Sequence, residues 1–126
     1  VERLLVEDVV DTTETTTSTS FVSLTTVGPQ LALTVGTKVW AFLNATCDNN
    51  TANTPAIASI EVSGATTTAA ADSRGITVEN TANAAVSGAR SLILGTTAGS
   101  NTFTMKYRVT AGTGRFQRRR LQALGL

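Results

Sequence analysis

The chain has 126 residues, which is enough for one folded domain with its own core and too few for two ordinary domains. Charged residues make up only 15% of it and the formal net charge is +1, so it lacks the basic excess typical of nucleic-acid-binding domains. It contains no histidine, which removes the commonest general base and the commonest metal ligand. Abundant Thr and Val favour extended backbone, so the composition predicts an all-β protein.

The sequence shows no targeting or membrane-spanning pattern. No stretch approaches the roughly 20 apolar residues of a membrane span. The N-terminal VERLLVEDVV carries three acids and has no apolar run of the kind found in signal peptides. We therefore expect synthesis in a cytoplasm and no membrane partner. The single Cys47 has no intramolecular disulfide partner, and we expect it to be a small buried apolar residue.

Residues 1–19 differ from the rest of the chain and are interpreted as an N-terminal arm. An apolar and acidic decapeptide ends at Asp11, and a Thr/Ser stretch follows. The arm is expected to dock on its own domain, on a sister subunit or on another protein. Its apolar residues suit either a helical turn or a strand. They form a candidate assembly anchor, which consists of Leu4, Leu5, Val6, Val9 and Val10.

From Phe21 onward, short extended runs alternate with turn signals such as Gly28-Pro29 and the segment DNNTANTP. The segment 65–75 is ambiguous, because its alanines suit a helical turn, but the preceding Gly64 and the threonine triplet favour an extended crossing or loop. The expected strands are 21–27, 30–35, 38–47, 56–64, 75–80, 89–97, 102–110 and 115–126.

Two of these strands carry the clearest patterns. In 38–47 both faces are apolar, with Trp40 and Phe42 opposite Val39 and Leu43, so the pattern predicts a central strand with Trp40 in the core. In 102–110, Phe103, Met105, Tyr107 and Val109 alternate with polar residues, so one face is expected to be core.

About eight short strands at regular spacing are typical of a sandwich or barrel. At this length we expect an antiparallel two-sheet β-sandwich of jelly-roll type. The domain boundary predicted from the composition shift places the arm at residues 1–19 and the jelly roll at residues 20–126.

Candidate chemistry is sparse. Five of the nine acidic residues lie in the arm, which leaves too few for a convincing pair of catalytic carboxylates. The DNNTAN loop has a single carboxylate where a calcium loop needs several, and the glycines lack the spacing of a phosphate loop. We expect no catalytic residue, no metal site and no cofactor.

The arginine run Arg118, Arg119 and Arg120 is the densest charge in the chain. Alternation along a strand predicts that Arg118 and Arg120 share a face with Phe116, while Arg119 points the other way. The even charge balance argues against a nucleic-acid tail, so no nucleic-acid partner is expected. We expect Arg118 and Arg120 to pair with acids of the arm or of a neighbouring subunit, or else the arginines to form a solvated strand edge.

Part of the sequence resembles a family of virion proteins. The stretches TTTSTSFVSLTTVGPQLALTV, ASIEVSGATTTAAADSRG and GTTAGSNTFTMKYRVTAGTGRFQRRR are similar to a recurrent domain of tailed-bacteriophage particles, over about residues 15 to 122. The most specific part is GSNTFTMKYRV, where ten residues of the pattern occur together in order: Gly99, Ser100, Asn101, Thr102, Phe103, Thr104, Lys106, Tyr107, Arg108 and Val109. The chain departs from the pattern at its end, which reads RRRLQALGL and lacks the usual proline.

The resemblance implies a non-enzymatic virion β-sandwich, of the kind found in capsid decoration (cement) proteins, head fibres and tail fibres. Without a fibre stalk, a decoration protein that stabilises the assembled head is the first expectation. Its implied partners are the major capsid protein and itself, as a trimer, on the outer surface of a phage head assembled in the host cytoplasm. The alternative is a head-fibre, tail-fibre or baseplate module that recognises a host-surface glycan or receptor.

Overall fold

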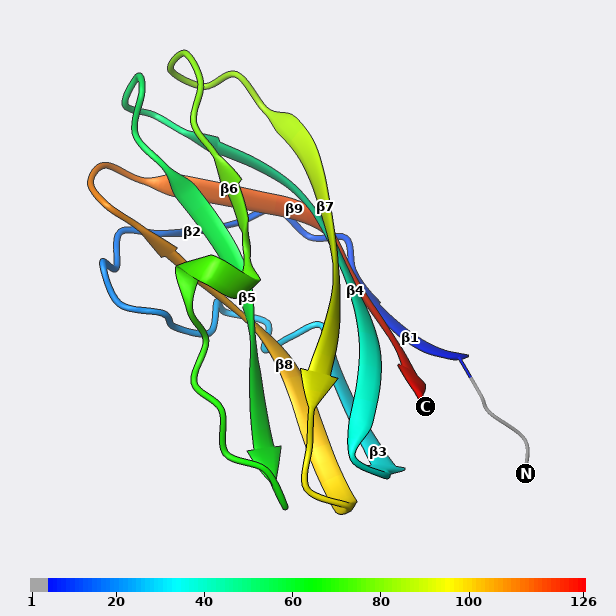
Figure 1. The fold of residues 1–126 in the computed structure, drawn as a ribbon. Coiled ribbons are helices and arrows are strands. Elements are labelled where there is room, and N and C mark those ends of the chain that lie inside the picture. Colours follow the sequence, from blue (N-terminus) through cyan, green and yellow to red (C-terminus); the bar gives the residue numbers. More distant parts are fainter. Residues whose placement is uncertain (1–4) are drawn as a thin grey trace.

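The computed structural model describes residues 5–126, which form an all-β fold with one short 3-10 helix (Figure 1). No helix in this part of the chain is long and apolar enough to cross a membrane. The strands are β1 (Leu5–Val10), β2 (Glu14–Thr16), β3 (Gln30–Val35), β4 (Lys38–Asn49), β5 (Ala56–Gly64), β6 (Ile76–Val78), β7 (Val86–Gly95), β8 (Gly99–Val109) and β9 (Gly114–Gly125), with the 3-10 helix η1 at Asp72–Arg74.

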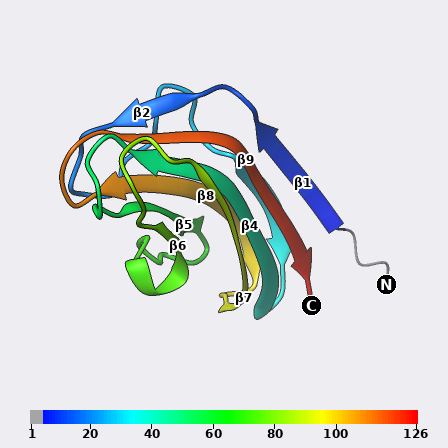
Figure 2. The same cartoon turned by 90° about the horizontal axis from the view of Figure 1, so that it is seen from above.

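The strands form two antiparallel sheets that pack face to face (Figure 2). In the first sheet the order is β1-β9-β4-β7, and β2 also pairs with β9. In the second sheet the order is β3-β8-β5-β6. When β1 and β2 are counted as one broken strand, this is the eight-position order of a jelly roll. The structure therefore confirms the predicted fold class.

The N-terminal segment is part of the first sheet. β1 pairs with Arg119–Leu124 of β9, and β2 pairs with Gly114–Phe116 of the same strand. β9 therefore lies between β4 and the N-terminal strands. A solvated edge role for β9 is thus wrong, because both of its edges carry hydrogen-bonded neighbours.

The core lies between the two sheets and follows the predicted alternation. Phe103, Met105, Tyr107 and Val109 of β8 are all fully buried, as expected. Val39 and Leu43 of β4 face them from the first sheet and are also fully buried. The inward side chains of each strand, which occur at every second residue, thus form one side of the core.

One local prediction needs correction, and the structure also settles an ambiguous segment. Residues 21–27 contain a single β-bridge, Val22 with Tyr107, and no strand. Backbone bonds from Val109 to Ser18 and from Met105 to Pro29 place this segment along the edge of β8, and Leu24 is buried. The ambiguous segment 65–75 is mostly loop, with η1 at its end. Side chains of Arg90 and Arg108 hold this loop, because they bind the Ser73 carbonyl and the Asp72 carboxylate.

The side chain of Cys47 on β4 is fully buried, so neither solvent nor reagents can reach its thiol. Burial, together with the neighbouring Asp48 charge, raises the pKa of its thiol to about 12. We expect no reaction of the folded protein with Ellman's reagent at pH 8, and one thiol per chain to react in denaturant. Reaction of the native protein at the rate of a free thiol would contradict this burial.

Candidate interaction surface

A β-bulge in β9 sets the directions of the three arginines. The register between β4 and β9 shifts between Asn44 and Thr46, and Arg118 adopts a left-handed backbone with φ of 50°. The bulge adds one residue to the strand, so the alternation changes phase. Phe116 and Arg119 are therefore buried, whereas Arg118 and Arg120 are exposed. The predicted grouping of Phe116 with Arg118 and Arg120 is thus wrong.

Arg119 is the largest fully buried side chain of the described residues. Its terminal nitrogens donate to Glu14 Oε1 at 3.0 Å and to the Gly28 carbonyl at 3.2 Å. Its guanidinium carbon also lies 5.2 Å from the centroid of the Tyr107 ring, and the Tyr107 hydroxyl donates to the same Gly28 carbonyl at 2.8 Å. This cluster joins β2, β8 and β9 to the loop before β3.

Glu14 completes the cluster and is held as a carboxylate. Burial acts to raise its pKa, but hydrogen bonds from the side chain and amide of Thr26, a bond from Thr12 and the charge of Arg119 outweigh burial. Together they lower the pKa of Glu14 to about 2. Glu14 therefore stays ionised opposite Arg119, and the pair fastens the N-terminal segment to the core.

Two further arm acids also bind within the chain. Glu7 pairs with Arg120 through the Arg120 Nε at 2.9 Å and accepts from Gln122 at 3.1 Å. Asp8 accepts from the amide of Gln30, at the start of β3, at 2.8 Å. The predicted pairing of Arg118 and Arg120 with arm acids thus holds within one chain for Arg120. Within residues 5–126 Arg118 makes no ion pair, and Arg119 pairs with Glu14 instead.

The Glu7–Arg120 pair is exposed on both sides, so we expect it to contribute little to stability. Arg120→Glu should lower the free energy of unfolding by about 1 kcal/mol or less, through like-charge repulsion with Glu7. The loss should shrink in high salt and reverse in the swapped double variant Glu7→Arg/Arg120→Glu. Urea unfolding at two salt concentrations measures this, and a loss that salt leaves unchanged would contradict a surface origin.

The structure separates the members of the candidate assembly anchor. Val6 and Val10 are half-buried and Val6 packs against the core, whereas Leu5 and Val9 are exposed on the other side of β1. Leu4 lies outside the described residues.

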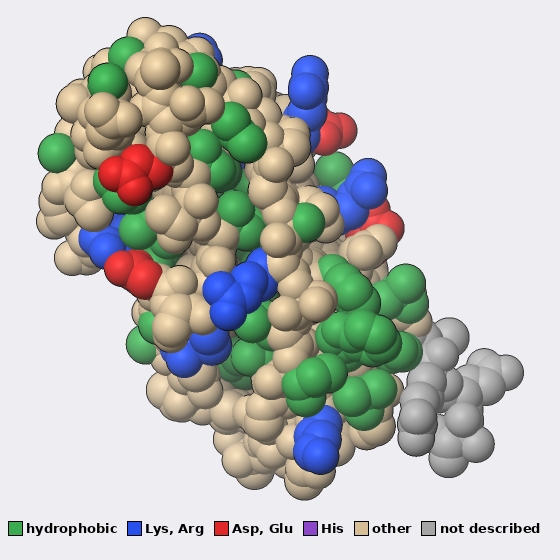
Figure 3. All heavy atoms as spheres, turned by 45° about the horizontal axis from the view of Figure 1, so that its top comes forward, with side chains coloured by type: hydrophobic (Ala, Val, Ile, Leu, Met, Phe, Trp, Pro, Cys, Tyr) green, Lys and Arg blue, Asp and Glu red, His purple; other side chains and the backbone are tan. Residues whose placement is uncertain are grey.

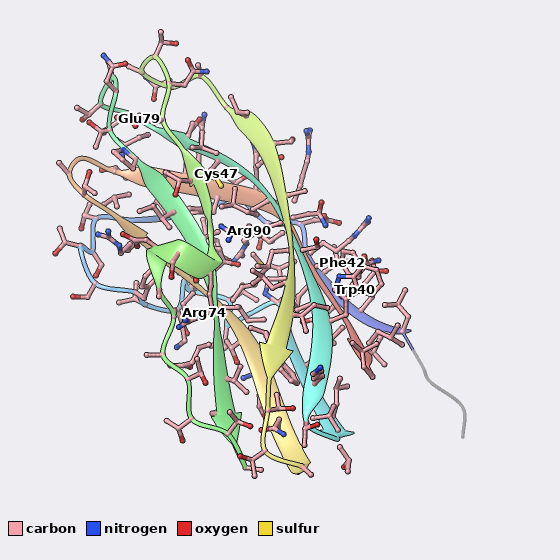
Figure 4. The ribbon with its side chains drawn as sticks, in the orientation of Figure 1. Trp40, Phe42, Cys47, Arg74, Glu79 and Arg90 are labelled. Carbon is pink, nitrogen blue, oxygen red and sulfur yellow. The ribbon has the colours of Figure 1, made fainter. Side chains whose placement is uncertain are left out.

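Beyond Leu5, an apolar row crosses the outward side of the first sheet. Register places Leu5 opposite Leu124, Leu124 opposite Trp40, and Trp40 opposite Ile93. Phe42 stands beside Trp40, with ring centroids 4.8 Å apart (Figure 4). Ile93 is 59% exposed, Leu5 57% and Trp40 39%. We call Leu5, Trp40, Phe42, Ile93 and Leu124 the apolar face.

Figure 3 shows hydrophobic side chains gathered in one area, with basic side chains around it and one acidic side chain beside a basic one at its upper edge. Such a contiguous apolar surface on a soluble domain marks an interaction site more often than scattered apolar residues do. The predicted core position of Trp40 is therefore wrong, because its side chain is exposed on the outward side of the first sheet.

Next to the apolar face, an open groove of about 540 Å³ lies over the β9 bulge. It is flanked by Arg118, Arg120 and Asp11. Thr46 and Ser87, whose hydroxyl oxygens lie 2.8 Å apart, form part of its lining. Its remaining lining residues are Val9, Asn44, Ala45 and Gly88.

Sequence reasoning missed the apolar face, although the signal was present. Both sides of β4 are apolar, and this pattern alone does not distinguish a strand covered on both sides by its own core from one whose outward side binds a partner. Ile93 and Leu124 lie at matching positions on β7 and β9, but only the register shows that they adjoin Trp40. The groove lies over the β-bulge of β9, and no local sequence pattern predicts that bulge.

Among residues 5–126, no group of three or more metal-ligating side chains occurs. The acids outside the arm include three that form ion pairs: Asp48 with Arg115, Asp72 with Arg108, and Glu61 with Lys106. The hydrogen bond from Arg108 outweighs the opposing effect of burial and lowers the pKa of Asp72. Each of these three carboxylates therefore has a cation as its partner.

Comparison with models of protein families, and with curated proteins, finds no match to this chain. Among solved structures, a chain in the structure of infectious bursal disease virus, Gx strain, superimposes on 98% of this chain with a TM-score of 0.66 and 10% identity. A tailspike protein 4 enzymatically active domain from bacteriophage CBA120 matches 94% of this chain at 17% identity, with a TM-score of only 0.38.

This chain spans 32% of the length of the first of these chains and 19% of the second. At such low identity the viral likeness concerns the fold alone, and the tailspike likeness is too slight to argue from. The strand order and the first likeness agree. The chain is a two-sheet jelly-roll β-sandwich.

Proposed function

We propose that this chain is a non-enzymatic structural protein of a bacteriophage particle, a decoration (cement) protein on the outer surface of the assembled head. The observation that carries the proposal is the apolar face on the outward side of the first sheet. The jelly-roll fold and the family resemblance of the 99–109 segment support the viral setting.

The apolar face has the make-up of a docking surface. An exposed tryptophan with aliphatic neighbours at the centre, and charged side chains at the rim, is the usual arrangement of binding hot spots. Here Trp40 contacts Phe42 at the centre, and the Glu7–Arg120 pair lies at the rim. The proposed partner is the major capsid protein, and a trimer of this chain is the favoured oligomer.

Binding by this face explains how a small domain would stabilise a shell. A protein that binds only the assembled form shifts the equilibrium toward assembly by mass action. Many symmetry-related copies, each spanning neighbouring capsid subunits, add avidity to individually modest contacts. The N-terminal strands supply no free tether for this, because β1 and β2 are paired along β9.

The absence of enzymatic activity is part of the proposal. Support comes from the carboxylates, since Glu14 and Asp72 have lowered pKa values and cation partners. A general acid would instead need a raised pKa.

Co-sedimentation with particles of the virus that encodes this chain tests the proposal. We expect saturable binding to assembled heads, and no binding to unassembled capsid protein or to isolated tails. Binding to tails alone would favour a fibre or baseplate module instead, and no binding to any particle fraction would refute a virion role.

A further inference from the structure

The groove beside the apolar face has features of a ligand site that head binding does not require. It lies where the β9 bulge sets Arg118 and Arg119 opposite the single residue Ala45. Bulges commonly redirect a side chain at functional sites. Arg118 is one of only three non-glycine residues with positive φ among those described, and it is the only one of the three within a strand. A strained position of this kind points to a role for the side chain it presents.

The side chain of Arg118 is available to a ligand. Within residues 5–126 it makes no ion pair, whereas Arg108, Arg115, Arg119 and Arg120 each do. Arg120 pairs with Glu7 through Nε at 2.9 Å, but half of its side chain is exposed and it also lines the groove. Two guanidinium groups at one end of a groove provide the planar donors that suit a carboxylate.

The rest of the lining suits a ligand with hydroxyl groups. Asp11 can only accept hydrogen bonds, and the Thr46 and Ser87 hydroxyls both donate and accept. Gly88 and Ala45 leave a small-residue floor, and Val9 supplies an apolar wall. The groove's volume of about 540 Å³ lies within the range of small-molecule sites.

The charge pattern selects among anions. A nucleic acid or a phosphorylated chain would bring several negative charges close to Asp11, and a simple inorganic anion would leave the hydroxyl partners unused. We propose that this groove binds one carboxylated sugar residue, with the carboxylate on Arg118 and Arg120 and the sugar hydroxyls on Asp11 and the Thr46–Ser87 pair. The apolar face takes no part in this binding.

Titration of the isotope-labelled protein by NMR tests the site. The acidic probes are methyl β-glucuronide and N-acetylneuraminate, the neutral probe is methyl β-glucoside, and the simple anion is sulfate. We expect saturable shifts of the Thr46, Ser87 and Gly88 amides with at least one acidic sugar, and affinity at least about tenfold weaker for the neutral sugar and for sulfate. Equal shifts with sulfate would mean an adventitious ion only, and no shift with either acidic sugar would also overturn the proposal.

Variants then identify the contacts. Arg118→Gly keeps a residue suited to the left-handed backbone and removes the guanidinium, and it should weaken acidic-sugar binding by about tenfold or more. Asp11→Asn should also weaken it, because a hydroxyl acceptor is impaired. Tighter binding by Asp11→Asn would show recognition of charge alone and overturn the sugar assignment. Lys38→Gln, which removes a cation outside the groove, should leave affinity unchanged.

The test of sugar binding and the test of head binding can fail independently of each other. Head binding is measured by co-sedimentation and depends on the apolar face, so loss of one activity predicts nothing about the other. Arg118→Gly should therefore sediment with heads as the unmodified chain does, and a joint loss would contradict two separate surfaces.

Discussion

Replacing Glu14 by alanine is expected to lower the free energy of unfolding by about 3–5 kcal/mol. The substitution leaves the Arg119 guanidinium fully buried with the Gly28 carbonyl and the Tyr107 ring as its remaining partners. A buried charge without its counterion is far costlier than the intact pair is stabilising. It also removes the bonds to Thr26 that hold the loop before β3. Urea unfolding followed by circular dichroism measures the change.

Two variants test the cause. Glu7→Ala removes an arm carboxylate from an exposed pair and should cost about 1 kcal/mol or less. Glu14→Leu combined with Arg119→Met removes both charges and should recover much of the stability lost by Glu14→Ala, because an apolar pair can replace a buried ion pair. Similar losses for Glu14→Ala and Glu7→Ala would contradict the buried cluster as the fastening of the N-terminal strands.

The Glu14–Arg119 pair predicts that the stability of the folded domain decreases at acidic pH. Because the folded pKa of Glu14, about 2, is below its ordinary value of 4.5, its contribution is fully present above pH 5 and is lost as the pH falls toward 2. Asp72 acts in the same direction, since its pKa is also lowered. Unfolding midpoints measured from pH 7 to pH 2 should fall more steeply for the unmodified chain than for Glu14→Gln. Parallel curves would show that Glu14 does not titrate in this range.

The second large effect concerns binding. The double substitution Trp40→Asp/Ile93→Asp is expected to weaken head binding by at least about 100-fold, since central tryptophan anchors often contribute 2 kcal/mol or more each. Both side chains lie on the outward side of the sheet, so the core should stay intact and the stability loss should be limited to the Trp40–Phe42 contact. Co-sedimentation gives the affinity and thermal unfolding gives the stability.

A matched pair of substitutions provides the control. Thr77→Asp/Ser63→Asp places the same two charges on exposed positions of the second sheet. It should leave head binding unchanged. Equal weakening by both double variants would attribute the effect to added charge, and unimpaired binding by Trp40→Asp/Ile93→Asp would remove the apolar face from the proposal.

Most of the fold could be predicted because each core strand carries its own alternation. Phe103, Met105, Tyr107 and Val109 repeat every second residue, so β8 and its inward face were visible locally. The strand that pairs with the N-terminal segment could not be predicted in this way, because β9 lies more than a hundred positions away in the sequence. The interpretation of residues 1–19 left three docking sites open, and register along β9 shows the contact made by residues 5–16.

The arginines show why the site was harder to predict. Strict alternation assigns Arg119 outward, but one extra residue at the bulge reverses every later side chain of β9. This reversal buries Arg119 against Glu14 and Tyr107, and Arg118 is exposed at the groove. The exposure of Trp40 was also unpredictable from the sequence, because a large apolar residue in a strand that is apolar on both faces is usually buried.

Electron cryomicroscopy of the particle that carries this chain tests the central proposal most directly. We predict density for the sandwich on the outer surface of the head, with the β1-β9-β4-β7 sheet and Trp40 against the shell and the second sheet facing solvent. Density confined to the tail, or a sandwich bound to the head with Trp40 facing solvent, would contradict the account.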